Sequence, residues 1–447
     1  MAEVQSKTTK MKQLPEGWEL KKIIELCDEI TDGSHYSPTD ALKGKHYIAS
    51  VKDFSEYGFD IKSCKKISEK DYLDLIKNGC VPNCDDVLLS KDGTMGIVYV
   101  SRGEPIALLS SIAIIKPNKQ IYPKYLAYFL KDKRTQDELT NNYSSGSALP
   151  RIVLKDLKEL KIAFPINLQE QRSIANMLSS IDAKIEINRG INRTLEAIGQ
   201  LLFKHWFIDF EFLDEKGKPY KSSGGKMVDS ELGLIPEGWE VKRLTEAADF
   251  LRGFSYRGSE KGSSGRFLFI TLNSIYEGGG FKREFCYMTS ERLKGHHFIE
   301  EGDIIITNTE QTKRGTLIGF PALVEFPQER DTNLKAAFSH HITKVIPKKN
   351  ELKHYLMNYL SFNQKRTVGY TTGSVILGLD VQNWIKNEKI IIPPFYQLKE
   401  YHELMENIFR IKLNNNNKND VLSKIRELLL PKLMSGKVRV PISDNVS

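Results

Sequence analysis

Carboxylate and lysine side chains near residue 90 come closest to a catalytic spacing in this chain. A nuclease needs closely spaced carboxylates and a lysine to hold a metal ion and the phosphate under attack. Asp85, Asp86 and Lys91 supply these groups, but Leu89 lies two positions before the lysine, where another carboxylate is required. Because leucine binds no cation and accepts no proton, this segment does not fit a nuclease site.

A second pattern, Pro393-Pro394-Phe395, has the form of the Pro-Pro-aromatic segment found in enzymes that methylate amino groups. Those enzymes place an asparagine or aspartate before the prolines, so that its side chain accepts a hydrogen bond from the target amine. Here the preceding residue is Ile392, whose side chain accepts none. We therefore interpret the two prolines as the extended segment before a helix.

Other catalytic and metal-binding motifs are missing. The chain contains no phosphate-binding P-loop, no dinucleotide fingerprint after a strand and no H-E-x-x-H zinc motif. Cys80 and Cys84 lack a second pair at zinc-ligand spacing. The doublets His296-His297 and His340-His341 favour core or surface histidines over ligands, because neighbours on a strand point to opposite faces. The sequence predicts no catalytic residue and no metal site.

The elements that must position the polar side chains occur twice. Residues 14–23 (Leu-Pro-Glu-Gly-Trp-Glu-Leu-Lys-Lys-Ile) return in similar form at 235–244, residues 143–147 return at 370–374, and residues 195–203 return at 422–430. A repeat of about 220 residues indicates a duplicated domain, because solenoid units are only about 20–50 residues long. Two copies related by a pseudo-two-fold axis suit a partner with two-fold symmetry of its own, such as duplex DNA.

Composition narrows the class of protein only slightly. The 447 residues carry 65 basic and 57 acidic side chains, a net charge of +8 that permits nucleic-acid binding without requiring it. No apolar run approaches the roughly 18 residues of a membrane span, so we expect no membrane partner. Residues 1–13 are polar and lack the apolar core of a secretory signal. Five cysteines without framework spacing favour reduced thiols and a cytoplasmic location.

Each repeat begins with a mixed segment of strands and short helices. In the first repeat, residues 86–90 and 96–100 read as strands around an exposed turn. In the second, residues 302–307 and 315–319 read as strands around a polar loop that extends to residue 314. Apolar residues at helical spacing predict short helices near 124–131 and 353–361.

A long helix with a heptad seam follows each mixed segment. Steps of four and three predict that the helices pair along apolar seam residues, which are Ile174, Leu178, Ile181, Ile185 and Leu195 in the first helix and Leu404, Ile408, Ile411, Leu422, Ile425 and Leu429 in the second. Both seams turn polar midway, at Asn188 and Asn192 and at Asn415 and Lys418. The asparagine run 414–417 suggests a local kink or bulge. The alternative, helices that pack separately on their own domains, is disfavoured because each has a single apolar stripe of matching length.

Residues 217–225 are rich in Gly, Ser and Lys and read as a flexible linker. The fold class expected is α+β, with two pseudo-two-fold-related mixed α/β domains separated by an antiparallel pair of long coiled-coil helices. The expected boundaries are a tail (1–13), a first domain (14–166), a central helix (167–212), a linker (213–234), a second domain (235–395), a C-terminal helix (396–436) and a tail (437–447).

Seven motifs follow one another along nearly the whole chain. They are the two Pro-Glu-Gly-Trp-Glu openings, Ile30-Thr31-Asp32-Gly33-Ser34-His35, the stretch from Ser145 to Ile152, Leu168-Gln169-Glu170-Gln171-Arg172, Phe203 to Glu211, Lys216 to Tyr220, and Leu430 to Gly436. In this order and spacing they resemble the DNA-specificity (S) subunit of type I restriction-modification systems. The second half departs from the pattern. It has Phe250-Leu251-Arg252-Gly253-Phe254 at about the place of the Asp-Gly-x-His segment, and Tyr396-Gln397-Leu398-Lys399-Glu400 opens its helix.

The resemblance implies a non-enzymatic subunit. Each mixed domain would be a target-recognition domain reading one part of a split double-stranded DNA sequence. The helices would set the gap between half-sites and dock two methyltransferase (M) subunits, and restriction-translocase (R) subunits would join for cleavage. S-adenosylmethionine, ATP and Mg²⁺ would be cofactors of those partners, with none on this chain.

Base reading in the major groove needs polar side chains on exposed loops. The candidates for DNA contact in the first domain are Ser34, His35, Tyr36, Lys91, Thr94, Ser144, Ser145, Gly146, Ser147 and Arg151, and those in the second are Arg252, Tyr256, Arg257, Asn308, Gln311, Lys313, Arg314, Thr371, Thr372, Gly373 and Ser374. Gly146 and Gly373 would let backbone N–H groups approach a phosphate.

Two other classes of protein fit parts of the sequence. The mild net charge also suits a coiled-coil scaffold that joins two proteins without binding DNA. A nuclease or methylase with an unfamiliar site would require activity from the chain alone.

Overall fold

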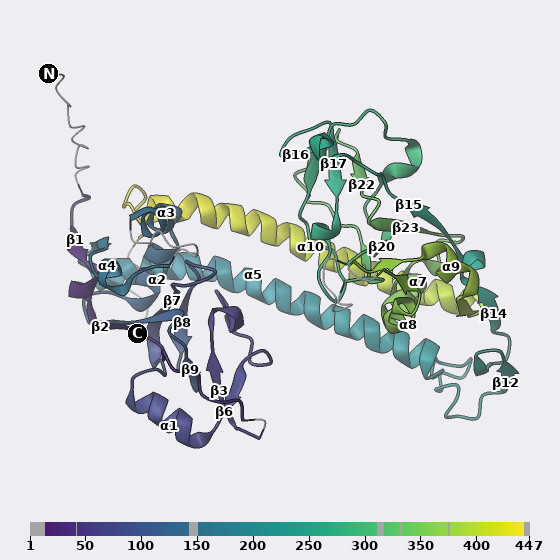
Figure 1. The fold of residues 1–447 in the computed structure, drawn as a ribbon, viewed down its shortest axis with the longest axis horizontal. Helices are drawn as coiled ribbons and strands as arrows, with labels where there is room; N and C mark the ends of the chain where they lie inside the picture. The colour runs from purple at the N-terminus through teal and green to yellow at the C-terminus, as the bar shows by residue number, and fades with distance from the viewer. Residues whose placement is uncertain are drawn as a thin grey trace. The chain divides into compact units, whose positions relative to one another are not determined.

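The computed structural model of the protein describes residues 14–41, 43–142, 151–310, 317–330, 333–373 and 376–441. These residues divide into two compact units (Figure 1). The first unit joins the chain up to Ile185 with the chain from Val421 onward, and the second comprises Glu186–Asp420. Both long helices, α5 (Leu168–Phe203) and α10 (Phe395–Leu433), therefore contribute a part to each unit.

The first unit is built on an antiparallel sheet of order β2-β10-β7-β8. Helix α2 packs on β7 and β8 and begins with Pro123, whose fixed φ suits the first turn of a helix. Apolar residues from this face of the sheet, from α2 and from the first part of α5 form the main core of the unit. The bounds are β2 (Cys27–Asp32), β10 (Ile112–Pro117), β7 (Cys84–Ser90), β8 (Val98–Arg102) and α2 (Pro123–Lys131).

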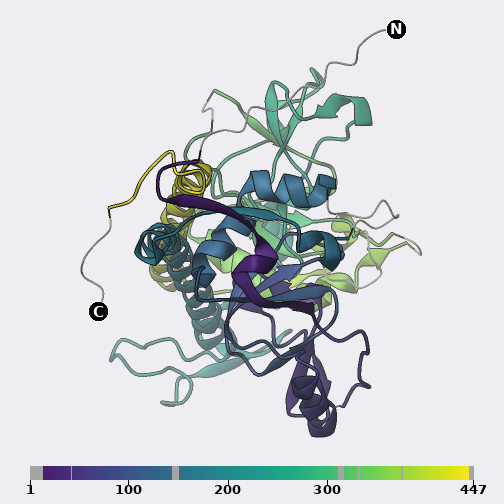
Figure 2. The ribbon, with the colours of Figure 1, turned by 90° about the vertical axis from the view of Figure 1, so that its left-hand side faces the viewer.

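Smaller elements surround this sheet. Helix α1 packs on strands β3 and β9 at one edge of the unit (Figure 2). The elements are β1 (Trp18–Lys22) paired with β11 (Lys161–Pro165), the sheet β6 (Lys65–Ile67), β3 (His46–Ala49) and β9 (Ile106–Leu108), the hairpin β4 (Phe54–Ser55) and β5 (Gly58–Phe59), and helices α1 (Glu69–Lys77), α3 (Lys133–Asn142) and α4 (Leu154–Leu157).

The second unit repeats the same sheet, in the order β15-β23-β20-β21, again antiparallel. Helix α7 packs on β21 and β23, in the place that α2 takes in the first unit. The bounds are β15 (Ala248–Arg252), β23 (Ile342–Pro347), β20 (Ile304–Thr307), β21 (Pro321–Leu323) and α7 (Leu352–Phe362). The short helices expected from the sequence near 124–131 and 353–361 are thus confirmed as α2 and α7.

The second unit also carries a five-stranded sheet and several short elements. They are β16 (Lys261–Gly262), β18 (Cys286–Met288), β17 (Phe267–Ile270), β22 (Ala336–Phe338) and β19 (Phe298–Ile299) in that order, the pairs β12 (Met227–Ser230) with β13 (Gly233–Pro236), β14 (Glu240–Arg243) with β26 (Lys389–Ile392) and β24 (Thr371–Thr372) with β25 (Gly378–Leu379), and helices α6 (Leu244–Ala247), α8 (Gln364–Val368) and α9 (Val381–Asn387).

Both strands predicted around the first loop form, although the second begins at Val98, two residues later than predicted, whereas the second strand predicted around the second loop does not form as expected. We expected a strand at 315–319, but residues 317–319 form a turn and the strand β21 begins at Pro321. The Glu310 carboxylate accepts hydrogen bonds from the backbone N–H groups of Leu317 (3.2 Å) and Ile318 (3.4 Å). Because these N–H groups are bound by a side chain, they do not form a strand ladder.

Within the second unit, α5 and α10 run antiparallel. Residues later in α5 contact residues earlier in α10. Asn188 pairs with Asn419, Asn192 with Asn416 and Glu196 with Lys412. Helix α5 ends in one π-helical turn over Lys204–Ile208. Helix α10 is continuous through residues 414–417, so the kink or bulge expected at the asparagine run is absent. The amides of Asn415, Asn416 and Asn417 bond to side chains of other segments, which holds this part of the helix in place.

The residues predicted to form the helix seam are buried or half-buried on α5, whereas three of those on α10 are exposed. Ile174, Leu178 and Ile185 are buried, and Ile181 and Leu195 are half-buried. On α10 Ile408 is buried and Leu422 and Leu429 are half-buried, but Leu404, Ile411 and Ile425 are exposed by 39%, 48% and 40%.

Two of the three exposed residues are replaced in the seam by the polar residue that follows them. Lys412 follows Ile411 and contacts Glu196, and Arg426 follows Ile425 and contacts Asp182. Asn419, which follows the predicted seam residue Lys418, contacts Asn188 in the same way. The sequence pattern followed the apolar residues at both ends of α10, so it selected the neighbouring stripe of the same heptad spacing, with Lys418 as a polar member.

The segment predicted to be a flexible linker is folded. Phe212 stacks on Tyr220, with ring centroids 4.6 Å apart, and on Trp239 at 5.3 Å. The hairpin of β12 and β13 follows directly. Aromatic stacking and hairpin pairing fix residues whose composition alone suggested a flexible chain.

Candidate nucleic-acid interface

Corresponding residues lie at the same end of each sheet, where strands β2 and β15 finish. We call this the open end of the sheet. Asp32 is the last residue of β2 and pairs with Ala113 on β10, while Arg252 is the last residue of β15 and pairs with Thr343 on β23. Beyond β7 and β20, Asp92 bridges to Arg151 and Thr309 bridges to Gly378. Residues that are distant in sequence thus gather at this end of each sheet.

Both domains have a glycine at this end of the sheet, Gly33 and Gly253, for a steric reason. A Cβ atom on Gly33 would lie 2.3 Å from the carbonyl oxygen of Leu108, and one on Gly253 would lie 2.3 Å from that of Ser339. Both glycines donate from their backbone N–H groups to equivalent isoleucine carbonyls, Ile112 and Ile342, at 3.1 Å. The structure therefore matches Asp32-Gly33 with Arg252-Gly253, a correspondence that the sequence placed only roughly.

Lys91 does not lie on an exposed loop as predicted. It is only 3% exposed, and its Nζ atom lies 3.1 Å from Asp32 and 3.4 Å from Asp92. Its charge is neutralised inside the domain, because a buried ammonium group requires nearby carboxylates. The prediction that Lys91 lies exposed for DNA contact is therefore wrong, and Lys91 is an internal ion-pair residue.

Four other candidates of the first domain are exposed. Tyr36, His35 and Arg151 present large parts of their side chains to solvent, and Thr94 lies at the exposed turn after β7. Ser34 is oriented locally, because its hydroxyl donates to the Tyr36 carbonyl at 2.7 Å.

The second domain brings Arg252, Asn308 and Thr372 to one cleft of about 320 Å³. Arg252 is exposed, whereas Asn308 is 6% exposed and forms part of the buried wall. The Asn308 amide donates to the carbonyl of His340 at 3.2 Å. Thr372 lies on the neighbouring short strand β24.

The remaining candidates of the second domain take different roles. Tyr256 packs edge-on against Phe269, with centroids 5.0 Å apart, and so supports the core. Arg257 is exposed. Thr371 donates to the Val368 carbonyl at 2.8 Å. Gly373 has φ +107°, and a Cβ there would lie 2.3 Å from the Ile376 carbonyl oxygen, so the tight turn requires glycine.

Eight candidates lie outside the described residues, and their contacts stay predictions. They are Ser144, Ser145, Gly146, Ser147, Gln311, Lys313, Arg314 and Ser374.

Sequence reasoning missed the polar clusters that hold each domain against the helices. In the first unit, Asp182 on α5 accepts from the Tyr128 hydroxyl at 2.6 Å and from Arg426 on α10 at 2.8 Å. Burial raises the pKa of the Tyr128 phenol, and the adjacent carboxylate adds to the shift. No heptad pattern could indicate this cluster, since its members come from three separate segments.

In the second unit, Arg283 forms the corresponding attachment. Its guanidinium lies 2.8 Å from Asp420 and 2.9 Å from the Asn417 amide oxygen on α10, and 3.3 Å from Glu325. Asn416 completes the cluster by donating to Glu325 at 2.8 Å. The asparagine run 414–417 was visible in the sequence, but it was interpreted as a local kink or bulge of the helix. In the structure its amides contact Asn192, Glu325 and Arg283, which lie on different sides of α10.

Within the described ranges, no three His, Cys, Asp or Glu side chains are grouped closely enough to hold a metal ion. Nor does any helix of that part of the chain combine the length and apolarity needed to cross a membrane.

Comparison with known proteins identifies the family. Residues 15–197 and 236–424 each match the family model described as the type I restriction modification DNA specificity domain. The chain therefore belongs to the type I restriction-modification DNA specificity family. Within such a system it is the specificity subunit, the component that carries no catalytic activity, and the catalytic activities belong to other subunits.

Individual relatives agree with this assignment. The chain is 29% identical to the type I restriction enzyme MjaIX specificity subunit of Methanocaldococcus jannaschii, over 98% of this chain and 97% of that protein. It is 23% identical to the HindI specificity subunit of Haemophilus influenzae, over 73% and 80%. The crystal structure of a type I restriction-modification S subunit from M. genitalium has a similar fold, with a TM-score of 0.52 and 17% identity over 93% of this chain and 96% of that one. The resemblance inferred from the sequence and the α+β fold are confirmed.

Proposed function

We propose that each mixed domain reads one half of a bipartite, asymmetric duplex DNA site. One observation carries the proposal: the two domains share a sheet and a glycine at its open end but differ in the side chains that stand around this glycine. Asp32 and Lys91 occupy the positions in the first domain that Arg252 and Asn308 occupy in the second. Different side chains on one frame suit the reading of two different half-sites.

We further propose that the helices dock two copies of a methyltransferase subunit. Ile198 and Leu201 on α5 are exposed by 42% and 66%, and their repeat counterparts Ile425 and Leu428 on α10 are exposed by 40% and 65%. A large apolar side chain that is exposed to the same extent in both copies supports a contact made twice with one kind of partner.

The helix pair would also set the gap between half-sites, since α5 has 36 residues and extends about 54 Å at 1.5 Å per residue. Restriction-translocase subunits would join this complex for cleavage. S-adenosylmethionine, ATP and Mg²⁺ would bind to the partner subunits, where the chemistry takes place.

The proposal is tested by reconstituting the chain with its methyltransferase subunits and selecting duplexes from a random library. A split motif with a fixed gap is expected, and binding should weaken steeply with salt as phosphate counterions are released. The competing function is a coiled-coil scaffold for two proteins. Binding of the protein partners that is insensitive to salt, without any selected duplex, would establish the scaffold instead.

A further inference from the structure

The polar groups at the open end of the sheet are satisfied in the first domain and left open in the second. Lys91 is enclosed by Asp32 and Asp92. At the equivalent places of the second domain, Arg252 is exposed and Asn308 is neutral. Within the described part of the chain, the Arg252 guanidinium has neither a hydrogen bond nor an ion pair. The second domain therefore offers a positive charge where the first has a closed ion pair.

Arg252 lies on the wall of a cleft whose inner surface is polar. Asn308 and Thr343 also line this cleft, and they are 6% and 1% exposed. The Asn308 Oδ1 and Thr343 Oγ1 atoms are buried without a hydrogen-bond partner among the described residues. Unpartnered buried polar atoms cost free energy, so a cleft that retains two of them next to a free guanidinium has the character of a binding site.

The orientation of the Asn308 amide is fixed by its neighbours. Its Nδ2 atom donates to the carbonyl of His340, and the opposite orientation would bring two oxygens together. Oδ1 is therefore left as an acceptor. The Asp380 carboxylate, which also lines the cleft, is a second acceptor and accepts from the Asn383 backbone N–H at 3.1 Å.

A cleft with one strong donor and two acceptors does not suit a phosphate group, because the acceptors repel its oxygens. It suits the major-groove edge of a G·C pair, which offers the O6 and N7 acceptors of guanine beside the amino donor of cytosine. We propose that this cleft reads a G·C pair, with Arg252 donating to guanine and the acceptor wall facing the cytosine amino group. Arg252 is then a specificity-determining residue of the second domain.

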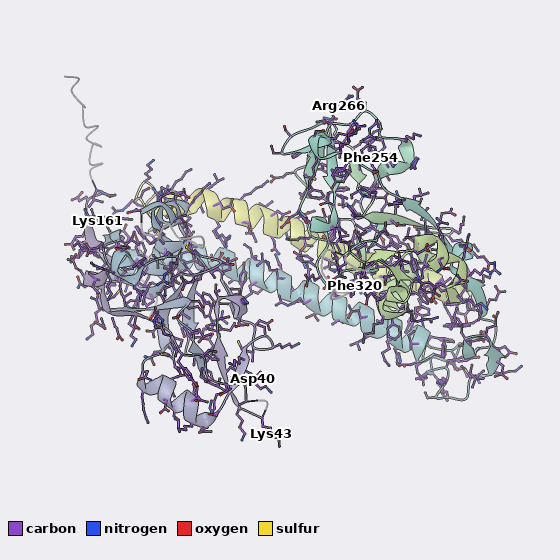
Figure 3. All side chains as sticks on the ribbon, in the orientation of Figure 1. Asp40, Lys43, Lys161, Phe254, Arg266 and Phe320 are labelled. Atoms are coloured by element: carbon purple, nitrogen blue, oxygen red, sulfur yellow. The ribbon has the colours of Figure 1, made fainter. Side chains whose placement is uncertain are left out.

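This inference rests on the proposed function, since it assumes that the second domain faces duplex DNA. The test uses the complex of the full chain with its methyltransferase subunits and a duplex library randomised in both half-sites. Arg252→Gln removes the charge and the bidentate donors. Arg266→Gln is the matched control, because Arg266 (labelled in Figure 3) is also exposed, belongs to the same unit and does not line the cleft.

For Arg252→Gln we expect the guanine preference to disappear at one position of one half-site. Affinity for the original duplex should fall between about fivefold and about 150-fold, while the other half-site stays unchanged. Arg266→Gln should keep the motif. An unaltered motif in Arg252→Gln would overturn the inference, whether its affinity is equal to that of the wild type or lower for all sequences, as expected for a phosphate contact.

Arg252→Lys provides a second readout that does not depend on loss of charge. Lysine keeps the charge that a phosphate contact needs but lacks the fork that fits guanine. We expect a relaxed guanine preference in this variant as well, and full preference would contradict the inference. If the wild-type complex selects no split motif at all, the proposed function fails. If it selects one that Arg252 does not affect, only the present inference fails.

Discussion

The side-chain amide of Asn188 on α5 donates to that of Asn419 on α10, with 2.8 Å between Nδ2 and Oδ1. Both residues are buried, at 2% and 8% exposure. About one helical turn away, the Asn415 amide donates to that of Asn192 at 2.9 Å. A helix pair with amides in its seam gives up some stability, but it fixes which residues face each other.

Replacing both amides by leucine is expected to stabilise the helix pair while weakening its register. In Asn188→Leu alone, the Asn419 amide remains buried without its partner, which should cost about 1–3 kcal/mol of unfolding free energy. The double variant Asn188→Leu/Asn419→Leu should recover that loss and self-associate. Denaturant unfolding and sedimentation velocity measure the two effects, and a double variant less stable than either single one would contradict the argument.

The glycine at the sheet end offers a test of the shared frame. A Cβ on Gly253 would lie 2.3 Å from the Ser339 carbonyl oxygen, so Gly253→Ala should lower the unfolding free energy by about 2 kcal/mol or more. Gly258→Ala is the control, because nothing lies within 4 Å of its Cβ position. The control should change the denaturation midpoint little, and an equal loss in both variants would show that the close approach is not the cause.

This glycine also shows what the sequence could and could not predict. The duplication, the α+β class, the long helices and the short helices α2 and α7 followed from repeats and periodicity. The match of Asp32 with Arg252 was placed only roughly, because the two residues have opposite charge and the segments around them differ. It depends on strand register and on two carbonyl groups that lie far from both residues in the sequence.

The α10 seam and Lys91 were missed for a related reason. Leu404, Ile411 and Ile425 form a heptad stripe as regular as the true one, but the true stripe includes Lys412, Asn419 and Arg426. A polar residue can be buried where the fold brings a hydrogen-bonding or charged partner next to it. Such partners are distant in the sequence, so the sequence pattern does not reveal them. Lys91 is buried because Asp32, from a distant strand, reaches it.

The pH dependence of stability should be affected by His354. This residue is 1% exposed, and its Nε2 atom lies 2.9 Å from the Glu406 carboxylate. Burial lowers the pKa of His354 below its ordinary value of 6.5, and it outweighs the hydrogen bond to Glu406, which acts to raise that pKa. The unfolded chain therefore binds a proton that the folded chain does not, and stability falls as the pH decreases below about 6.5.

The hydrogen bond from His354 also keeps the pKa of Glu406 below its ordinary range, so the contribution of that carboxylate is lost only at still lower pH. His354→Gln keeps a donor for Glu406 but cannot titrate. Thermal unfolding midpoints between pH 7 and pH 5 should therefore fall less steeply in His354→Gln than in the wild type. Parallel curves for the two proteins would show that His354 takes up its proton equally in both states.

The repeated apolar residues on the helices predict a stoichiometry. Leu201→Asp and Leu428→Asp should each prevent one methyltransferase subunit from binding, and the double variant should bind none. Because both side chains are about two-thirds exposed, at 66% and 65%, each substitution should change stability by no more than about 0.5 kcal/mol. Native mass spectrometry counts the bound subunits. Leu213→Asp, at a residue exposed by 58% outside the helices, is the control. Two bound subunits in the double variant would exclude these residues from the interface.

The helix pair as a ruler is best tested by lengthening it, because residues along both helices hold the domains and a deletion would remove those contacts. Duplicating Glu186–Asn192 in α5 together with Asn415–Val421 in α10 adds seven residues to each helix at facing positions, and it leaves the contacts of Asp182 with Arg426 and of Arg283 with Asp420 unchanged.

The insertion adds about 10 Å and nearly two full turns to each helix, so each domain stays on almost the same face of its helices. The selected motif should keep both half-sites and gain a wider gap, by up to about three base pairs at 3.4 Å each. Insertion in one helix alone should lower stability and leave no fixed gap, since the asparagine pairs lose register. An unchanged gap in the double insertion would show that another part of the complex sets the spacing.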